Sequence, residues 1–179
     1  MTNRATDKEN TTFRLEKATL EKINFEAEQK GVSMNTIAQN IFSQYFGWQA
    51  GATKAGMIPV HKTVLSLVFD KLSEQDDIKI AELFANVKVK NMLLVLRNNY
   101  SPVDFLDMFE AWLKSSSLAH TKHINHDTQV YTITHEMGNK WSIYLHHMLQ
   151  TVLHKMGLKG ITFESTDDTI MFKVPLLLL

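Results

Sequence analysis

Residues 10–46 place one short strand pattern before two helix patterns, and this order constrains the fold more than any other feature of the chain. Apolar and polar side chains alternate over residues 10–15, which is typical of a strand with one buried face. The spacing of apolar residues then predicts helices at about 18–30 and 33–46, separated by a Gly-x-Ser turn. A glycine can end the first helix in the left-handed conformation, and a serine can cap the second.

The strand pattern has no partner within this segment. A lone strand leaves its backbone N–H and C=O groups unpaired, whereas folded proteins pair nearly all such groups that they bury. The simplest partner is the same strand of a second copy of the chain. The segment therefore predicts a homodimer with a two-stranded antiparallel ribbon.

This order of elements resembles the ribbon-helix-helix family of DNA-binding proteins, of the Arc, MetJ and CopG type. The residues that carry the resemblance follow without a gap: Thr12-Phe13-Arg14-Leu15, Leu20, Ile23, Ala27, Gly31-Val32-Ser33, Ile37, Ala38, Ile41, Phe42 and Tyr45-Phe46. The resemblance implies a dimerisation and DNA-binding domain at residues 1–46, preceded by a flexible N-terminal arm. It also implies that the ribbon enters the major groove of double-stranded DNA, which is wide enough for two strands.

The same resemblance assigns DNA contacts to six residues. The outward-facing strand residues would read base edges, and here those are Asn10, Thr12 and Arg14. The start of the second helix would hold a phosphate through Ser33, Met34 and Asn35. General physics agrees with the second assignment, because the first N–H groups of a helix lack intrahelical partners and attract anions.

The distribution of charge weakens the expectation of DNA binding. The chain has 19 basic and 19 acidic residues, and residues 32–46 contain no lysine or arginine. A strongly basic surface is the usual mark of nonspecific DNA binding. The sequence therefore leaves two functions open: a sequence-specific transcriptional regulator, or a dimerisation and protein-interaction module, including the antitoxin type, with little or no DNA binding.

Glycines punctuate residues 47–59 before Pro59, which predicts a linker there. Residues 60–179 are long enough to bury a second core, and their motifs are too general to identify a family. We expect this second domain to assemble the protein, to sense a small-molecule or protein effector, or to recruit a partner.

The pattern of the second domain is mostly helical at first. One helix start is clear, with Ser101 as the cap and Pro102 at the first helical position. The apolar run 92–96 fits a buried helix or a strand, with the helix favoured by the residues before it. The sequence then predicts a β-α-β-β unit with strands at 129–135, 161–164 and 169–174 around a helix at 140–156. The fold class predicted for the whole chain is α+β, mostly helical.

Three histidines stand three residues apart before the first of those strands, at His120, His123 and His126. Imidazole is a ligand for zinc, nickel and copper, so these are candidate metal ligands. The more ordinary interpretation is a solvated polar loop. We therefore predict no metal and no cofactor.

Composition and motifs exclude several other functions. The chain has no cysteine, which excludes disulfides and thiolate nucleophiles and fits a reducing cytoplasm. It shows no phosphate-binding loop, zinc-protease motif or nucleophile elbow, so we expect no enzymatic activity. We also expect no membrane partner, because no apolar run is long enough to span a bilayer. The aromatic and methionine residues of the second domain, such as Trp112, Trp141, Met148 and Met171, are expected in its core.

Overall fold

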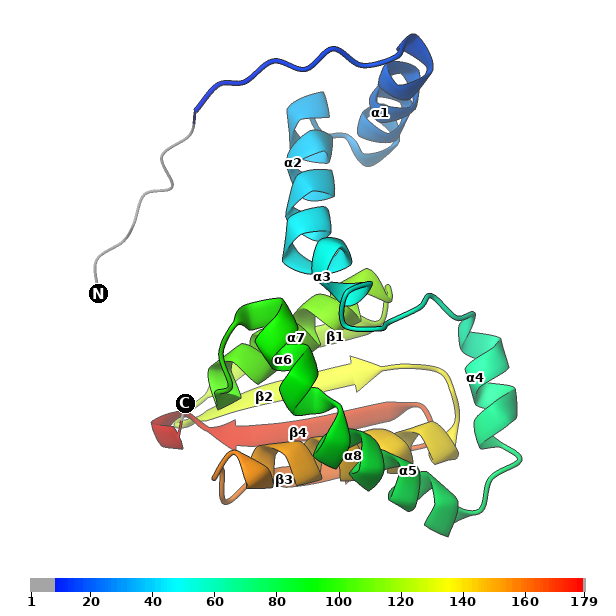
Figure 1. Cartoon of the computed structure of the whole chain (residues 1–179), viewed down its shortest axis with the longest axis vertical. Coiled ribbons are helices and arrows are strands. Elements are labelled where there is room, and N and C mark those ends of the chain that lie inside the picture. The colour runs from blue at the N-terminus through cyan, green and yellow to red at the C-terminus, as the bar shows by residue number, and fades with distance from the viewer. Residues whose placement is uncertain (1–8, 179) are drawn as a thin grey trace. The chain divides into compact units, whose positions relative to one another are not determined.

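The computed structural model describes residues 9–178 and contains both helices and an antiparallel sheet, so the predicted α+β class is confirmed (Figure 1). The chain divides into two compact units, residues 1–43 and 44–179. Most of the predicted N-terminal arm, residues 1–8, lies outside the described residues.

The first unit is built from two helices, α1 (Lys17–Lys30) and α2 (Met34–Gln44). Gly31 ends α1 with a φ of 62°, and its N–H donates to the carbonyl oxygen of Glu28. This left-handed conformation suits glycine because a Cβ would make it costly. Ser33 caps α2, since its Oγ accepts a hydrogen bond from the Thr36 N–H at 3.1 Å. The two predicted helices and the Gly-x-Ser turn between them therefore agree with the structure.

The predicted strand at residues 10–15 does not form in the single chain. Residues 9–16 have no regular secondary structure, and the sheet among the described residues is built entirely from the second unit. A strand is stabilised only when its backbone groups meet those of another strand. The ribbon thus stays a prediction about two copies of the chain.

The predicted linker at 47–59 is wrong in its first half. The π-helix η1 (Tyr45–Gln49) and the short α3 (Ala50–Ala52) follow α2 directly. Trp48 and Ala52 are buried in the core of the second unit. Gly51 serves this packing, because a Cβ there would overlap the Leu96 side chain. One of the glycines on which the linker prediction rested, Gly51, instead lets α3 pack closely against the Leu96 side chain.

The second unit continues with four helices, then two strands, a long helix and two more strands. Their bounds are α4 (Lys62–Phe69), α5 (Glu74–Val87), α6 (Val89–Arg97), α7 (Pro102–Ser115), β1 (Ala119–Asn125), β2 (Thr128–Thr134), α8 (Asn139–Lys155), β3 (Thr162–Ser165) and β4 (Thr169–Pro175), followed by the 3-10 turn η2 (Leu176–Leu178). The ambiguous run 92–96 is helical, and α7 begins at Pro102 as predicted.

The predicted β-α-β-β unit lacks one strand that the structure contains. The sheet has four antiparallel strands in the order β1-β2-β4-β3, so the chain forms a hairpin on each side of α8. β1 is an edge strand with mostly exposed, polar residues. The sequence prediction missed it because an exposed edge strand carries no alternating apolar signal.

Helices cover one face of this sheet, and the core lies between the two layers. α8 packs on β3 and β4, α7 packs on β1, and α5 lies along α8 (Figure 1). The rings of Tyr131 on β2 and Phe172 on β4 stack with their centroids 4.7 Å apart. Register pairs these two residues, and both are buried, so the central strands supply the floor of the core.

Candidate functional site

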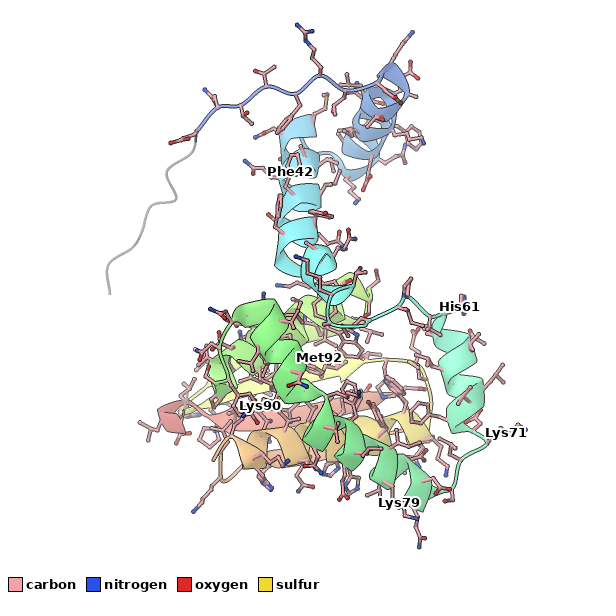
Figure 2. All side chains as sticks on the ribbon, viewed as in Figure 1. Phe42, His61, Lys71, Lys79, Lys90 and Met92 are labelled. Atoms are coloured by element: carbon pink, nitrogen blue, oxygen red, sulfur yellow. The ribbon has the colours of Figure 1, made fainter. Side chains whose placement is uncertain are left out.

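The three predicted base-contacting residues are accessible in the structure. Asn10, Thr12 and Arg14 are all exposed in the segment before α1. Between them, the Phe13 ring lies against Phe42 of α2, with ring centroids 5.4 Å apart (Figure 2). The Phe13 ring thus contacts α2, while the neighbouring polar side chains are exposed.

The three predicted phosphate-contacting residues lie together at the start of α2. The Oγ of Ser33 is already engaged by the Thr36 N–H and lies 2.8 Å from the Thr36 hydroxyl. The first-turn N–H groups of Met34 and Asn35 have no intrahelical acceptor by geometry, and both residues are exposed. An anion could therefore be held by backbone N–H groups here, at a helix end that Ser33 fixes.

Two of the four basic residues among residues 9–43 form local ion pairs. Lys17 lies 3.8 Å from Glu21, and Lys30 lies 2.6 Å from Glu26, both as exposed pairs one turn apart on α1. Arg14 forms no ion pair with any residue from 9 to 178. Among residues 9–43, Arg14 in the predicted ribbon and Lys22 on α1 are thus the basic residues without an ion pair.

The first unit leaves most of its large apolar side chains exposed. Only Ala27 and Ile37 are buried among its described residues. The exposed set is Phe13, Leu15, Phe25, Val32, Met34, Ile41 and Phe42. Phe13 retains 59% of its surface and Phe25 64%. A unit that buries only two apolar side chains lacks a core of its own.

The candidate metal ligands are not brought together. His120 and His123 stand on β1, and because successive strand residues alternate, an odd separation puts their side chains on opposite faces of the sheet. His126 lies in the following turn, where its Nδ1 is 2.7 Å from Asn125 Oδ1. Within residues 9–178, no group of three His, Asp or Glu side chains is placed to hold a metal ion.

A different histidine, His135, forms a buried polar network. Its Nδ1 accepts from the Met137 N–H at 3.1 Å, so its Nε2 carries the proton and donates to Ser142 Oγ at 2.8 Å. Ser142 Oγ in turn donates to the Thr166 carbonyl oxygen at 2.7 Å. Burial lowers the pKa of His135, while the Asp168 carboxylate opposes the shift.

This network is structural rather than catalytic. A nucleophilic serine must donate its proton to the histidine, whereas Ser142 donates to a backbone carbonyl and accepts from His135. His135 and Ser142 are both fully buried, so no substrate reaches them. No sequence motif marks this pair, because its members come together only when α8 packs beside the β3–β4 turn.

Comparison with known proteins adds no family to these observations. No protein-family model matches the chain, and no curated protein is significantly similar to it. Among residues 9–178, no helix combines the length and the apolar character needed to cross a bilayer.

Proposed function

We propose that the chain is a homodimeric DNA-binding transcriptional regulator whose first unit pairs with that of a second copy. The observation that carries this proposal is the exposed apolar surface of α1, α2 and the segment before α1. Two copies that share this surface would gain the core that one copy lacks, because apolar burial is the main driving force for association. The same pairing would give residues 10–15 their partner strand.

The case for DNA as the ligand rests on Arg14 and on the start of α2. In a paired ribbon, two copies of Arg14 and Thr12 would stand on the outer face, and a guanidinium can contact guanine through two hydrogen bonds. The N–H groups of Met34 and Asn35 would bind a phosphate on each side. In this division of roles, the ribbon selects the DNA sequence, and the helix ends fix the position of the protein on the DNA backbone.

A protein-interaction module is the second candidate function. It is favoured by the ion pairs on α1 and by the absence of lysine and arginine from α2, which leave little positive potential to attract DNA. In this version the first unit only joins two copies. The two candidates share the dimer and differ in the ligand.

Two experiments test the proposal in sequence. Sedimentation equilibrium of the full chain should show a dimer at micromolar concentration. In vitro selection from a random DNA library, followed by polarisation measurements over a salt series, should give a recovered site whose affinity falls steeply with salt.

Arg14→Ala should weaken binding to that site by about 1–3 kcal/mol. Lys22→Ala, which removes a basic side chain from α1 outside the predicted ribbon, is the matched control and should leave binding nearly unchanged. A dimer that selects no DNA would favour the protein-interaction module. A monomer would contradict both functions, because one chain cannot complete the ribbon.

A further inference from the structure

The helix α4 is anchored to the rest of the second unit at few points. Among its eight residues only Phe69 is buried, and both Leu67 and Val68 are more than half exposed. Residues 57–61 before the helix and 70–73 after it form neither helix nor strand (Figure 1). Segments that bury little apolar surface open at a lower free energy than the core of a domain. α4 therefore has the features of a segment that can open locally.

The inner side of α4 forms one wall of an apolar pocket. The Phe69 ring packs on Trp141 and Tyr144 of α8, with ring centroids 4.8 and 5.1 Å apart. Leu65 of α4, Trp141 and Tyr144 are among the fourteen side chains that line a partly open pocket of about 200 Å³. The lining includes all three tryptophans of the chain and no charged side chain. Movement of α4 away from α8 would therefore expose these apolar side chains.

One ammonium group connects three elements at the end of α4. Lys140, in the first turn of α8, donates from Nζ to the Leu72 carbonyl oxygen, 3.0 Å away in the turn between α4 and α5. The same Nζ lies 3.5 Å from Oδ2 of Asp77 on α5. Hydrogen bonds between an ammonium and a carboxylate are usually shorter, at about 2.7–2.9 Å. Lys140 thus holds the end of α4 and leaves its acidic neighbour without a hydrogen bond.

Asp77 is in an unfavourable environment while α4 is packed in this way. Its side chain is fully buried, and neither carboxylate oxygen accepts a hydrogen bond from residues 9–178. A buried carboxylate without hydrogen bonds is costly, and such groups are rare in folded proteins. Burial raises the pKa of Asp77, and the Lys140 ammonium opposes this shift. The packed arrangement satisfies the Leu72 carbonyl group and leaves the carboxylate unsatisfied.

We propose that α4 is a lid on the apolar pocket, and that Lys140 changes its acceptor when the lid opens. In the closed state, Lys140 donates to the Leu72 carbonyl oxygen. In the open state, this carbonyl turns to water, and Lys140 approaches Asp77, whose carboxylate becomes hydrated. The gain at Asp77 offsets part of the apolar surface that opening exposes. The inference concerns the second unit alone and does not rest on DNA binding.

Hydrogen–deuterium exchange of the full-length protein at pH 7.5, measured by mass spectrometry, tests for the two states. In the unmodified protein, peptides from α4 should exchange by local opening and at least about tenfold faster than peptides from β2 and β4. Urea below the unfolding transition should change the exchange of α4 little, because local opening exposes less surface than global unfolding does.

Two substitutions should change the exchange of α4 in opposite directions. Lys140→Met removes the donor to Leu72 and leaves Asp77 buried without a cation, so α4 should exchange at least about tenfold faster. Asp77→Asn replaces the buried charge by a neutral amide and removes the gain on opening, so α4 should exchange about fivefold to tenfold more slowly. Lys62→Met is the matched control. It breaks an exposed ion pair between α4 and Glu136 and should change the exchange less than about twofold.

An ordinary stabilising ion pair would give faster exchange in both Lys140→Met and Asp77→Asn, so unchanged or faster exchange in Asp77→Asn would overturn the lid. An Asp77→Asn variant that fails to fold would also overturn it, because the lid requires the buried charge to be unfavourable in the closed state. Exchange of α4 no faster than that of β4 in the unmodified protein, or equal acceleration by Lys62→Met and Lys140→Met, would have the same consequence. If Lys140→Met does not fold, the unmodified protein and Asp77→Asn decide the question.

Discussion

The two units of this chain differ in how completely they bury their apolar side chains. In the second unit, one continuous core runs from Trp48 to Val174. In the first, Ala27 and Ile37 are the buried apolar residues among those described, and Phe13 and Phe25 are mostly exposed. The second unit also has exposed apolar residues such as Leu83, but these lie on the surface of a unit whose core is complete. The second unit therefore has an apolar core of its own, whereas the described part of the first unit has none, and in the proposed dimer the second copy would supply it.

Removal of a central side chain of the second unit should have the largest effect on stability. Phe172 is fully buried against Tyr131, so Phe172→Ala should lower the free energy of unfolding by about 3–5 kcal/mol. Urea unfolding followed by tryptophan fluorescence measures the change, because all three tryptophans lie in this unit. Leu83→Ala on the exposed side of α5 is the control, with an expected change of at most about 0.5 kcal/mol. Similar losses for both variants would mean that this core is not the source of stability.

The corresponding change in the first unit should act on association. Phe42→Ala removes apolar surface that the second copy would cover, which should weaken the dimer about tenfold, or roughly 1.4 kcal/mol. Sedimentation equilibrium measures this change, while the tryptophan-monitored unfolding of the second unit should not move. Ile124→Ala, at an exposed position of the edge strand β1, should leave the dimer unaffected. A loss of second-unit stability in Phe42→Ala would contradict the separation of the two units.

The pH dependence of stability should belong mainly to the second unit. Burial lowers the pKa of His135, and burial with the nearby His147 lowers that of His146. Protonation therefore favours the unfolded chain, where histidine titrates near pH 6.5. Stability should be complete above about pH 6.5 and should fall as the pH drops below that value.

His135→Gln should cost about 1–3 kcal/mol at pH 7.5, because the Met137 N–H loses its acceptor, and should reduce the loss of stability on acidification. Thermal melts from pH 7.5 to 5.5 measure both effects. His146→Gln in the same series separates the contribution of the second histidine. An unchanged pH profile in the double variant would show that other groups control the acid response.

The smallest expected effect comes from two equivalent helix caps, one in each unit. Ser33 and Ser101 each accept a hydrogen bond at 3.1 Å from the N–H three residues later. Replacing either by alanine should cost about 1 kcal/mol. Ser101→Ala should shift the tryptophan-monitored transition at any protein concentration. Ser33→Ala should instead weaken the dimer, and equal shifts in the tryptophan signal for both variants would contradict the comparison.

The sequence predicted best those elements whose signals are local. The Gly31 stop, the Ser33 cap and the Ser101-Pro102 start all lie where their conformational preferences placed them. The hairpin of β3 and β4 also follows from alternation around a short polar turn. These predictions succeed because each depends on a few neighbouring residues.

The features that the sequence could not predict depend on contacts between distant residues. β1 is polar at nearly every position and becomes a strand only by pairing with β2. Gly51 suggested a flexible linker, yet its lack of a side chain serves packing against Leu96. Trp112 and Trp141 were expected in the core and pack there, whereas Trp48 lay in the predicted linker, and spacing along the chain could not show that all three line one pocket. The six predicted DNA contacts stay predictions, because they require a second copy and a ligand.

The strand order has a consequence for how the protein is made. Of the four described strands, β4 is synthesised after the other three, but it lies between β2 and β3. Until residue 175 has been synthesised, the nascent hairpin of β1 and β2 presents the unpaired edge of β2, and the apolar residues Tyr131 and Ile133 lack their β4 partners. Unpaired strand edges are the common starting point of misassembly between chains. Translation that halts before Thr169 should therefore yield an aggregation-prone fragment rather than a smaller folded domain.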